Sequence, residues 1–246
     1  MKFRTKLILG FSIVIFFISA ILGVVSYNFN SRRLSEKAAQ SLKFYSRQTA
    51  ANVDFTVDSM KHVTDYILSD PDMLNAMKTL PKYYGSSTYS KTIERNELLD
   101  TLNSGISMYY INSNFYRVII FNEFGDVASS TNTGSKITNK ARNTTTIDWL
   151  DSAARRHGKP ILVAPHMDGW GIRESEEVFS LARKVQGGDF GYIEVQYATD
   201  ELKDIFEIPD SDIKVVAFLP GGEILYQSEG LTDDLVSYIK KHPEVT

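Results

Sequence analysis

The sequence predicts an α+β protein with an N-terminal transmembrane helix, a long helix that leaves the membrane, and domains built on antiparallel sheets. Three observations predict this class. Residues 7–27 form an uncharged, almost wholly apolar run. A helical repeat that contains neither Pro nor Gly then extends from residue 31 to residue 69. From about residue 115 the pattern changes to short extended segments separated by Gly-containing turns.

The apolar run at residues 7–27 comes directly after three basic residues. A helix needs about 20 apolar residues to cross a bilayer, whereas the apolar stretch of a signal peptide has about 7–15. No small-residue cleavage site follows the run, so we expect an uncleaved anchor, with a cleaved signal peptide as the alternative. The positive charges before the run favour a cytoplasmic tail at residues 1–6 and an extracytoplasmic location for residues 28–246.

The composition excludes several classes of function. Residues 28–246 hold 30 Asp and Glu against 24 Lys and Arg, the opposite of the balance expected for a nucleic-acid binder. The chain has no Cys, and it contains no Gly-rich phosphate loop and no nucleophile elbow. His166 and Asp168 are residue types that bind metals, but two such residues do not complete a site. We therefore predict no catalytic residue, no metal site and no cofactor.

Residues 28–69 are predicted to form a stalk helix. At about 1.5 Å per residue, its uninterrupted part from residue 31 to residue 69 would be roughly 60 Å long. Asp70 and Pro71 should end it, because Asp caps a following helix and Pro suits its first turn. The apolar positions recur every three or four residues and need a partner. That partner is either the flank of the next domain or a second copy of the chain. We expect the flank to cover the stripe, with a homodimer contact nearer the membrane. These positions are Leu34, Ala38, Leu42, Tyr45, Thr49, Val53, Val57, Met60, Val63 and Ile67.

Extended segments with turn signals between them are expected in the second half of the chain. The first sheet should contain residues 116–121, 126–129, 160–164, 177–185 and 190–197. A short helix is expected from Asp148 to Gly158, and another from Thr199. Residues 214–219 and 223–227 read as the start of a second sheet.

The turn at Gly187 and Gly188 allows a prediction of which side chains share a face, if Val185 lies opposite Phe190. One face would then be small and apolar, suited to packing on the long helix: Val178, Ser180, Ala182, Ile193, Val195 and Tyr197. The other face would mix aromatic, charged and amide groups: Phe179, Leu181, Arg183, Tyr192, Glu194 and Gln196.

A mixed face of this kind is typical of a small-molecule pocket, where apolar walls carry a few polar groups. The alternative is an internal ion pair between Arg183 and Glu194 that binds no ligand. The loop from Pro165 to Gly171 is placed where it could cover the same sheet. The predicted ligand contacts are Trp149, Asp168, Trp170, Arg183, Tyr192 and Glu194.

The order of these elements, with the segments 148–150, 158–160, 179–185 and 190–195, resembles the double Cache (dCache) extracytoplasmic sensory domain. More narrowly, it resembles the form at the N-terminus of Gram-positive transmembrane sensor histidine kinases. The resemblance implies two PAS-like modules, with a small extracellular ligand bound in the membrane-distal one. That module would be residues 70–204, and residues 205–246 would begin a membrane-proximal module that is incomplete in this chain.

The chain departs from the amino-acid-binding branch of that family. This branch has an Arg two residues before a Trp, and an Asp in the last strand of the pocket. Here Ile147 precedes Trp149, and Gln196 stands at the Asp position. We therefore do not expect an α-amino acid ligand, and the ligand stays unidentified.

The resemblance implies the input region of a two-component sensor histidine kinase, with any kinase activity in a further C-terminal part. The alternatives are the input region of a chemoreceptor or another membrane-bound regulator, and a membrane-tethered solute-binding protein without kinase output. An anchored extracellular enzyme is disfavoured, because no nucleophile, acid–base pair or metal cluster was found.

Overall fold

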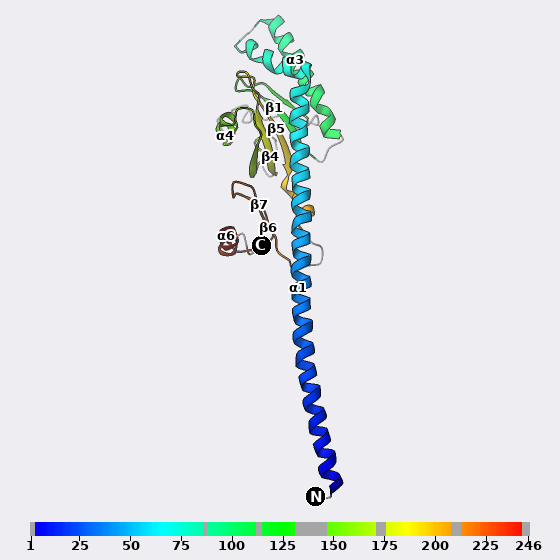
Figure 1. The fold of residues 1–246 in the computed structure, drawn as a ribbon. Helices are drawn as coiled ribbons and strands as arrows, with labels where there is room; N and C mark the ends of the chain where they lie inside the picture. The colour runs from blue at the N-terminus through cyan, green and yellow to red at the C-terminus, as the bar shows by residue number, and fades with distance from the viewer. Residues whose placement is uncertain are drawn as a thin grey trace. The chain divides into compact units, whose positions relative to one another are not determined.

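The computed structural model describes residues 3–85, 88–111, 115–130, 147–170, 176–207 and 213–242. These residues form an α+β structure with one long N-terminal helix, a five-stranded antiparallel sheet and a separate two-stranded sheet (Figure 1). The chain divides into two compact units, Met1–Asn52 and Val53–Thr246. The first unit, as far as the structure describes it, is helical throughout.

The long helix, α1, extends from Phe3 to Ser69 and contains both the predicted span and the predicted stalk. An 18-residue window of it has a mean hydropathy of 2.2, so α1 is long and apolar enough to cross a membrane. It ends where the sequence predicts. Asp70 caps α2 (Pro71–Thr79), its Oδ1 accepting hydrogen bonds from the backbone N–H of Asp72 at 2.9 Å and of Met73 at 3.0 Å.

The remaining helices of the described residues are short except for one. They are the 3₁₀ helix η1 (Leu80–Tyr83), α3 (Tyr89–Ile111), α4 (Leu150–Arg155), α5 (Thr199–Phe206) and α6 (Asp233–Lys241).

The five-stranded sheet has the order β2-β1-β5-β4-β3, and every neighbouring pair is antiparallel. Its strands are β1 (Arg117–Phe121), β2 (Val127–Ser129), β3 (Ile161–Met167), β4 (Glu177–Lys184) and β5 (Tyr192–Ala198). The predicted turn between β1 and β2 is confirmed. Asn122 Oδ1 accepts hydrogen bonds from the N–H groups of Phe124 and Asp126, both at 3.0 Å.

The predicted register of the β4–β5 hairpin is wrong by one residue. Lys184 pairs with Tyr192 and Arg183 with Ile193, and Val185 N–H donates to Gly191 O at 2.9 Å. Phe190 therefore belongs to the turn, where its ring lies over Gly187 and Gly188. Side chains alternate between the two faces of a sheet, so a shift of one residue changes which side chains of β4 share a face with those of β5.

Gly191 explains why the turn is longer than the sequence pattern predicts. Its φ of 106° is one that residues with a side chain rarely adopt, and a Cβ there would lie 2.1 Å from Phe121 O. The backbone of the hairpin thus approaches β1 so closely that only glycine fits. The two-glycine turn predicted from Gly187 and Gly188 did not include this third glycine.

Strand β3 is longer than the predicted segment 160–164 and continues past Pro165 to Met167. Its register with β4 shifts between Val163 and His166. Pro165 has no N–H to donate to the ladder, so the strand accommodates it with this irregularity at the edge of the sheet. The shift is what brings His166 back into pairing, opposite Val178.

One face of the sheet packs on helices α1, α2 and α3 (Figure 1). Met60, Val63 and Ile67 of α1 are at most 4% exposed and belong to the same core as the sheet residues. The flank of the following domain therefore covers this part of the helical stripe, as one of the two alternatives predicted. The sheet residues in this core are Val118, Ile120, Ala128, Phe179, Leu181, Ile193, Val195 and Tyr197.

The second predicted hairpin is confirmed as β6 (Val216–Phe218) and β7 (Ile224–Gln227), followed by α6. It contacts α5, where the rings of Phe206 and Tyr226 stack with centroids 4.6 Å apart. Tyr226 also donates its hydroxyl to Glu207 Oε1 at 3.1 Å. These contacts attach the small sheet to the end of the helix that follows β5.

Candidate functional site

The face of the sheet opposite the long helix carries aromatic and charged side chains. Alternation along β1 and β5 puts Arg117, Ile119 and Phe121 on this face, opposite Gln196, Glu194 and Tyr192. Helix α4 and the Asp168–Trp170 segment supply side chains that pack against this second, smaller core. We call this side of the sheet the outer face.

Four aromatic side chains fill the space between the outer face and α4. The ring of Phe121 contacts those of Trp170, Tyr192 and Trp149, with centroids 4.6, 5.4 and 5.9 Å away. Trp149 and Tyr192 are also edge to face, 6.2 Å apart. All four are at most 8% exposed. We call Phe121, Trp149, Trp170 and Tyr192 the aromatic cluster.

Glu194 is a fully buried carboxylate at the edge of the aromatic cluster. It accepts hydrogen bonds from Trp170 Nε1 at 2.7 Å, Ser180 Oγ at 2.7 Å and Gln196 Nε2 at 3.2 Å. Glu194 is the acceptor in all three of these hydrogen bonds. These donors come from β4, from β5 and from the segment after β3, so the carboxylate connects all three.

Asp168 and Arg117 form a buried ion pair beside Glu194, with Nη1 and Oδ2 3.1 Å apart. Asp168 Oδ1 also accepts hydrogen bonds from the N–H of Trp170 at 3.0 Å and from Gln196 Nε2 at 3.3 Å. The amide nitrogen of Gln196 is therefore shared between Asp168 and Glu194. A flipped amide would put its oxygen against both carboxylates, so the orientation is determined.

His166 approaches Glu194 from β3. Its Nδ1 is 2.8 Å from Ala164 O, and its Nε2 is 3.6 Å from Glu194 Oε1 and 3.5 Å from Ser180 Oγ. Burial lowers the pKa of His166, but the interactions with Glu194, the Ala164 carbonyl and Asp168 outweigh it and raise the pKa above the ordinary 6.5. The imidazole side chain is 29% exposed, so protons reach it from solvent.

Two buried polar atoms of this group have no hydrogen-bond partner among the described residues. They are Arg117 Nε, a donor, and Gln196 Oε1, an acceptor. Arg117 and Gln196 are cross-strand partners and are 3% and 0% exposed. A buried polar group without a partner costs about 1–3 kcal/mol, so such atoms mark a place where a bound molecule would supply hydrogen bonds.

Solved structures with the same architecture come from sensory proteins. The sensor domain of the V. cholerae histidine kinase DctB matches with a TM-score of 0.51 at 12% identity, over 82% of this chain and 74% of that domain. The ligand-binding domain of the Pseudomonas aeruginosa PAO1 amino acid chemoreceptor PctC, solved in complex with GABA, matches with a TM-score of 0.51 at 13% identity, over 80% and 77%. The chain has a Cache-type sensor fold. No protein-family model and no curated protein matches its sequence.

Five of the six predicted ligand contacts lie together on the outer face of this Cache fold. They are Trp149, Asp168, Trp170, Tyr192 and Glu194. Trp149 is the N-cap residue of α4, and Trp170 follows the turn that Asp168 forms with its side chain. Tyr192 donates its hydroxyl to Glu123 Oε1 at 3.1 Å, and burial together with this bond raises its pKa, which keeps the phenol neutral.

The sixth, Arg183, lies on the opposite face. It forms an ion pair with Asp65 of α1, and its Nε donates to Gly158 O. The predicted alternative, an Arg183–Glu194 pair, is wrong for the same reason, since the register places the two on different sides of the sheet. Ala182 was predicted to face the long helix and instead belongs to the core of the outer face.

The sequence prediction missed the cation that does neutralise a carboxylate on this face, Arg117. Its signal was present, because Arg117, Ile119 and Phe121 alternate with Val118 and Ile120. The sequence predicts a strand at residues 116–121 but assigns none of its side chains to a face of the sheet. His166 was considered only as a metal ligand, and its contact with Glu194 depends on the strand irregularity at Pro165.

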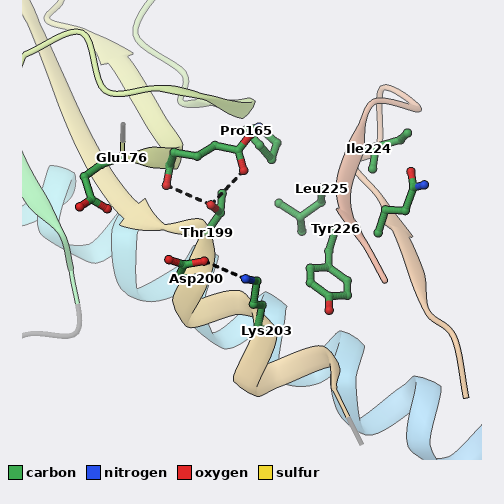
Figure 2. Close-up of a pocket in the computed structure, with 10 residues that line it drawn as sticks. Pro165, Glu176, Thr199, Asp200, Lys203, Ile224, Leu225 and Tyr226 are labelled. Atoms are coloured by element: carbon green, nitrogen blue, oxygen red, sulfur yellow. Dashed lines mark hydrogen bonds and ion pairs between the residues drawn. The ribbon is translucent and has the colours of Figure 1, made fainter. Parts of the chain in front are cut away.

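The Cache fold also has a separate hollow of about 480 Å³ below β3 and β4, beside α5 and β7 (Figure 2). None of the six predicted residues lines it. One wall has exposed polar groups, including Lys203 and Asp200 in an ion pair of 3.1 Å, and β7 forms the other wall. Neither unpaired buried atom belongs to its lining. The lining residues are Pro165, Glu176, Glu177, Thr199, Asp200, Lys203, Ile224, Leu225, Tyr226 and Gln227.

Proposed function

We propose that this chain is the extracytoplasmic ligand-sensing region of a transmembrane receptor. Residues 7–27 are its membrane span, residues 1–6 its cytoplasmic tail and residues 28–69 its stalk helix. The length and hydropathy of α1 support the span, and the basic residues before it support the orientation. The Cache-type fold supports sensing, since both DctB and PctC are sensory proteins.

One observation carries the proposed ligand site in the distal module, residues 70–204. A buried group of charged side chains with two unpaired polar atoms lies next to four aromatic rings. Small-molecule sites combine mostly apolar walls with a few polar groups that fix orientation. The proposed ligand contacts are Trp149, Asp168, Trp170, Tyr192 and Glu194, together with Arg117 and Gln196.

Because the aromatic rings contact one another, a ligand would enter by displacing one of them. Trp170 is the best candidate, since its ring is attached to the sheet through a hydrogen bond to Glu194 that a ligand could replace. Its displacement would also affect Asp168, which accepts a hydrogen bond from the Trp170 backbone. A bound ligand would in this way change the contacts between the sheet and the segment after β3.

Ligand binding can be tested by thermal unfolding of the full chain in detergent micelles against a panel of small neutral, anionic and cationic molecules. We expect at least one compound to stabilise the wild type and to lose its effect in Trp149→Leu. Arg183→Ala is the matched control, because Arg183 is also partly buried but lies on the other face. Equal stabilisation of the Trp149→Leu variant would place the ligand elsewhere, and the hollow in Figure 2 would be the next candidate.

For the output we propose a two-component sensor histidine kinase. DctB supports this choice and PctC supports the chemoreceptor alternative, with equal TM-scores. The coding sequence downstream of residue 246 tests it. A second membrane span followed by a histidine kinase core is expected. A chemoreceptor signalling helix, or the absence of any cytoplasmic region, would favour instead the chemoreceptor or a membrane-tethered binding protein.

We also propose that the receptor is a homodimer that associates through the stalk. Leu34, Ala38 and Leu42 recur every four residues, and Leu34 and Leu42 are 72% and 46% exposed. Apolar side chains at this spacing on one helix are typical of a helix–helix contact. Disulfide cross-linking through single Cys substitutions along residues 34–45 is expected to follow a helical period. Cross-linking without any period would argue against a defined dimer contact.

A further inference from the structure

The buried group on the outer face has an uneven charge. Asp168 and Glu194 are carboxylates and Arg117 is the guanidinium that pairs with Asp168, all three at most 3% exposed. Among the described residues, the other cationic partner within ion-pair distance of these carboxylates is His166, 3.6 Å from Glu194. With a neutral imidazole the group carries a net charge of −1. With a protonated imidazole its net charge is zero.

An unpaired charge in a protein interior is costly, because the attraction of surrounding dipoles does not replace the lost hydration. Among the residues that the structure describes, Glu194 is the carboxylate with no permanent cation within ion-pair distance. Two things can supply the missing positive charge: a proton on His166, or a cation that binds beside Glu194. Both neutralise the same carboxylate, so each makes the other less favourable.

The aromatic cluster favours a cationic ligand. The faces of Trp and Tyr rings attract ammonium groups within about 6 Å, and this attraction strengthens where water is excluded. Trp170 lies at the boundary between the rings and the carboxylate, because its Nε1 donates to Glu194 and its ring contacts Phe121. A cation that replaced this hydrogen bond would meet a carboxylate on one side and aromatic faces on the other.

Gln196 narrows the choice of cation further. Its Oε1 is a fully buried acceptor with no partner among the described residues, while its Nε2 is held by Asp168 and Glu194. The missing partner must be a donor. A protonated primary or secondary amine has N–H groups to donate, whereas a quaternary ammonium has none. The unpaired donor, Arg117 Nε, needs an acceptor such as a hydroxyl oxygen.

We propose that the outer face binds a small protonated amine next to Glu194, and that this amine competes with the proton on His166. The inference rests on the proposed function, since it assigns a ligand class to the same site. The groups facing the imidazole are Glu194 from β5, Ser180 from β4 and the Ala164 carbonyl of its own strand, with Asp168 beyond them. Amine binding therefore releases a proton when the imidazole is charged.

The direction of the pH dependence follows from this competition. Since the pKa of His166 is raised, the imidazole is protonated at mildly acidic pH and the amine must displace that proton. The dissociation constant should rise as pH falls, by up to about tenfold per pH unit below the pKa of His166. Above that pKa it should be independent of pH, as long as the amine stays protonated.

Tryptophan fluorescence measures binding at this site directly, because the chain has two Trp residues and both belong to the aromatic cluster. The full chain in detergent micelles is titrated with 2-aminoethanol hydrochloride at constant ionic strength. The neutral analogue 1,2-ethanediol and sodium acetate serve as controls. The proposal expects a saturable change with 2-aminoethanol at pH 8, a weaker response at pH 6, and none with the two controls.

Two variants test the assignment to residues. His166→Gln should bind 2-aminoethanol with the same affinity at pH 6 and pH 8, because it has no proton to displace. Glu194→Gln should lose the response at both pH values, while Glu97→Gln, an exposed carboxylate of α3, should keep it. The comparison of amine and neutral analogue on the wild type does not depend on how the variants fold.

Other outcomes separate this inference from the proposed function. A saturable response to 1,2-ethanediol or acetate that equals the response to 2-aminoethanol would overturn the amine class while leaving a ligand site on the outer face. No response to any of the three compounds would also overturn it, whereas the thermal-shift panel tests the site independently. A pH dependence that persists in His166→Gln would overturn the competition with the His166 proton.

Discussion

Arg183 of β4 forms an ion pair with Asp65 of α1, a residue 118 positions earlier in the sequence. The same guanidinium donates a hydrogen bond to the carbonyl oxygen of Gly158, which lies between α4 and β3. One side chain therefore joins the long helix, the central hairpin and the turn after α4. It does so on the face of the sheet away from the proposed ligand site.

The Arg183–Asp65 ion pair should contribute little to the free energy of unfolding, but its contribution should be measurable as a coupling between these two residues. Asp65→Ala is expected to lower the free energy of unfolding by less than about 1 kcal/mol, since both partners are partly exposed and solvent screens the pair. Arg183→Ala should cost more, because it also leaves Gly158 O without its donor. A double-mutant cycle measured by urea unfolding isolates the pair. A coupling energy near zero would show that the contact with Asp65 does not stabilise the fold.

Gly191 should be the least replaceable glycine of the hairpin. Gly191→Ala combines a φ of 106° with a Cβ 2.1 Å from Phe121 O, so β1 and β5 would have to separate. Gly125→Ala is the matched control, since its φ is 88° but nothing lies within 4 Å of the added atom. Strain at such a φ costs of order 1–3 kcal/mol. We expect Gly191→Ala to lower the free energy of unfolding by at least about 2 kcal/mol more than Gly125→Ala, and similar losses would contradict the close approach.

The stability of the unit Val53–Thr246 should depend on the protonation of His166. A group whose pKa is raised in the folded state stabilises the fold when it is protonated, and this contribution disappears as pH rises through the raised pKa. The free energy of unfolding should therefore have a component that decreases between mildly acidic and alkaline pH. Urea unfolding across this range is expected to show it in the wild type and in His62→Gln, an exposed residue of α1, but not in His166→Gln. An identical pH profile in His166→Gln would contradict the role of the Glu194 contact.

The proposed membrane orientation can be tested by labelling introduced Cys residues, because the chain has no native Cys that would react with the label. A membrane-impermeant maleimide should label Ser31→Cys and Lys159→Cys in intact cells. Thr5→Cys should be labelled only after the membrane is permeabilised. The reverse pattern would mean that residues 28–246 are cytoplasmic, and the loss of residues 1–27 from the mature protein would favour a cleaved signal peptide.

We also propose that the signal from a bound small molecule or from the cell envelope passes to the membrane through the stalk helix, residues 28–69. Val53→Pro removes a backbone hydrogen bond near the middle of the stalk and should cost roughly 3 kcal/mol or more locally. In the full-length receptor we expect ligand affinity to be kept and ligand-dependent output to be lost, because the distal module and the span would no longer be joined by an unbroken helix. Val53→Ala is the control for loss of the side chain alone. Normal output from Val53→Pro would show that α1 does not transmit the signal.

Most of the fold could be predicted from the sequence because it depends on local signals. The capping of α2 by Asp70, the turn at Asn122 and the period-two segments each need only a few neighbouring residues. The register of the β4–β5 hairpin depends instead on the contact of Gly191 with Phe121 O, which comes from a strand 70 residues earlier. A local pattern does not contain that contact, and a shift of one residue was enough to put Arg183 on the wrong face.

The candidate site shows the same division. Glu194 was predicted from the mixed face of the Gly187–Gly188 hairpin, and Trp149 and Trp170 were predicted to close the pocket over that face. Gln196 and Trp170 were predicted to lie near Glu194, but its other two partners were not. Ser180 was assigned to the opposite face by the wrong register, and His166 comes from a different strand. A buried charge is easy to recognise in a sequence, but its counterion is a matter of tertiary structure.

The irregularity of β3 at Pro165 also affects how the sheet meets other molecules. Unpaired edge strands are open to addition of a further strand, the usual route to aggregation and to growth of a sheet across two subunits. In this sheet β3 forms one edge and is interrupted by a proline, while β2 forms the other and has only three residues. Both edges are therefore poor templates for strand addition. Edge-to-edge association of this sheet with the sheet of a second copy is therefore disfavoured.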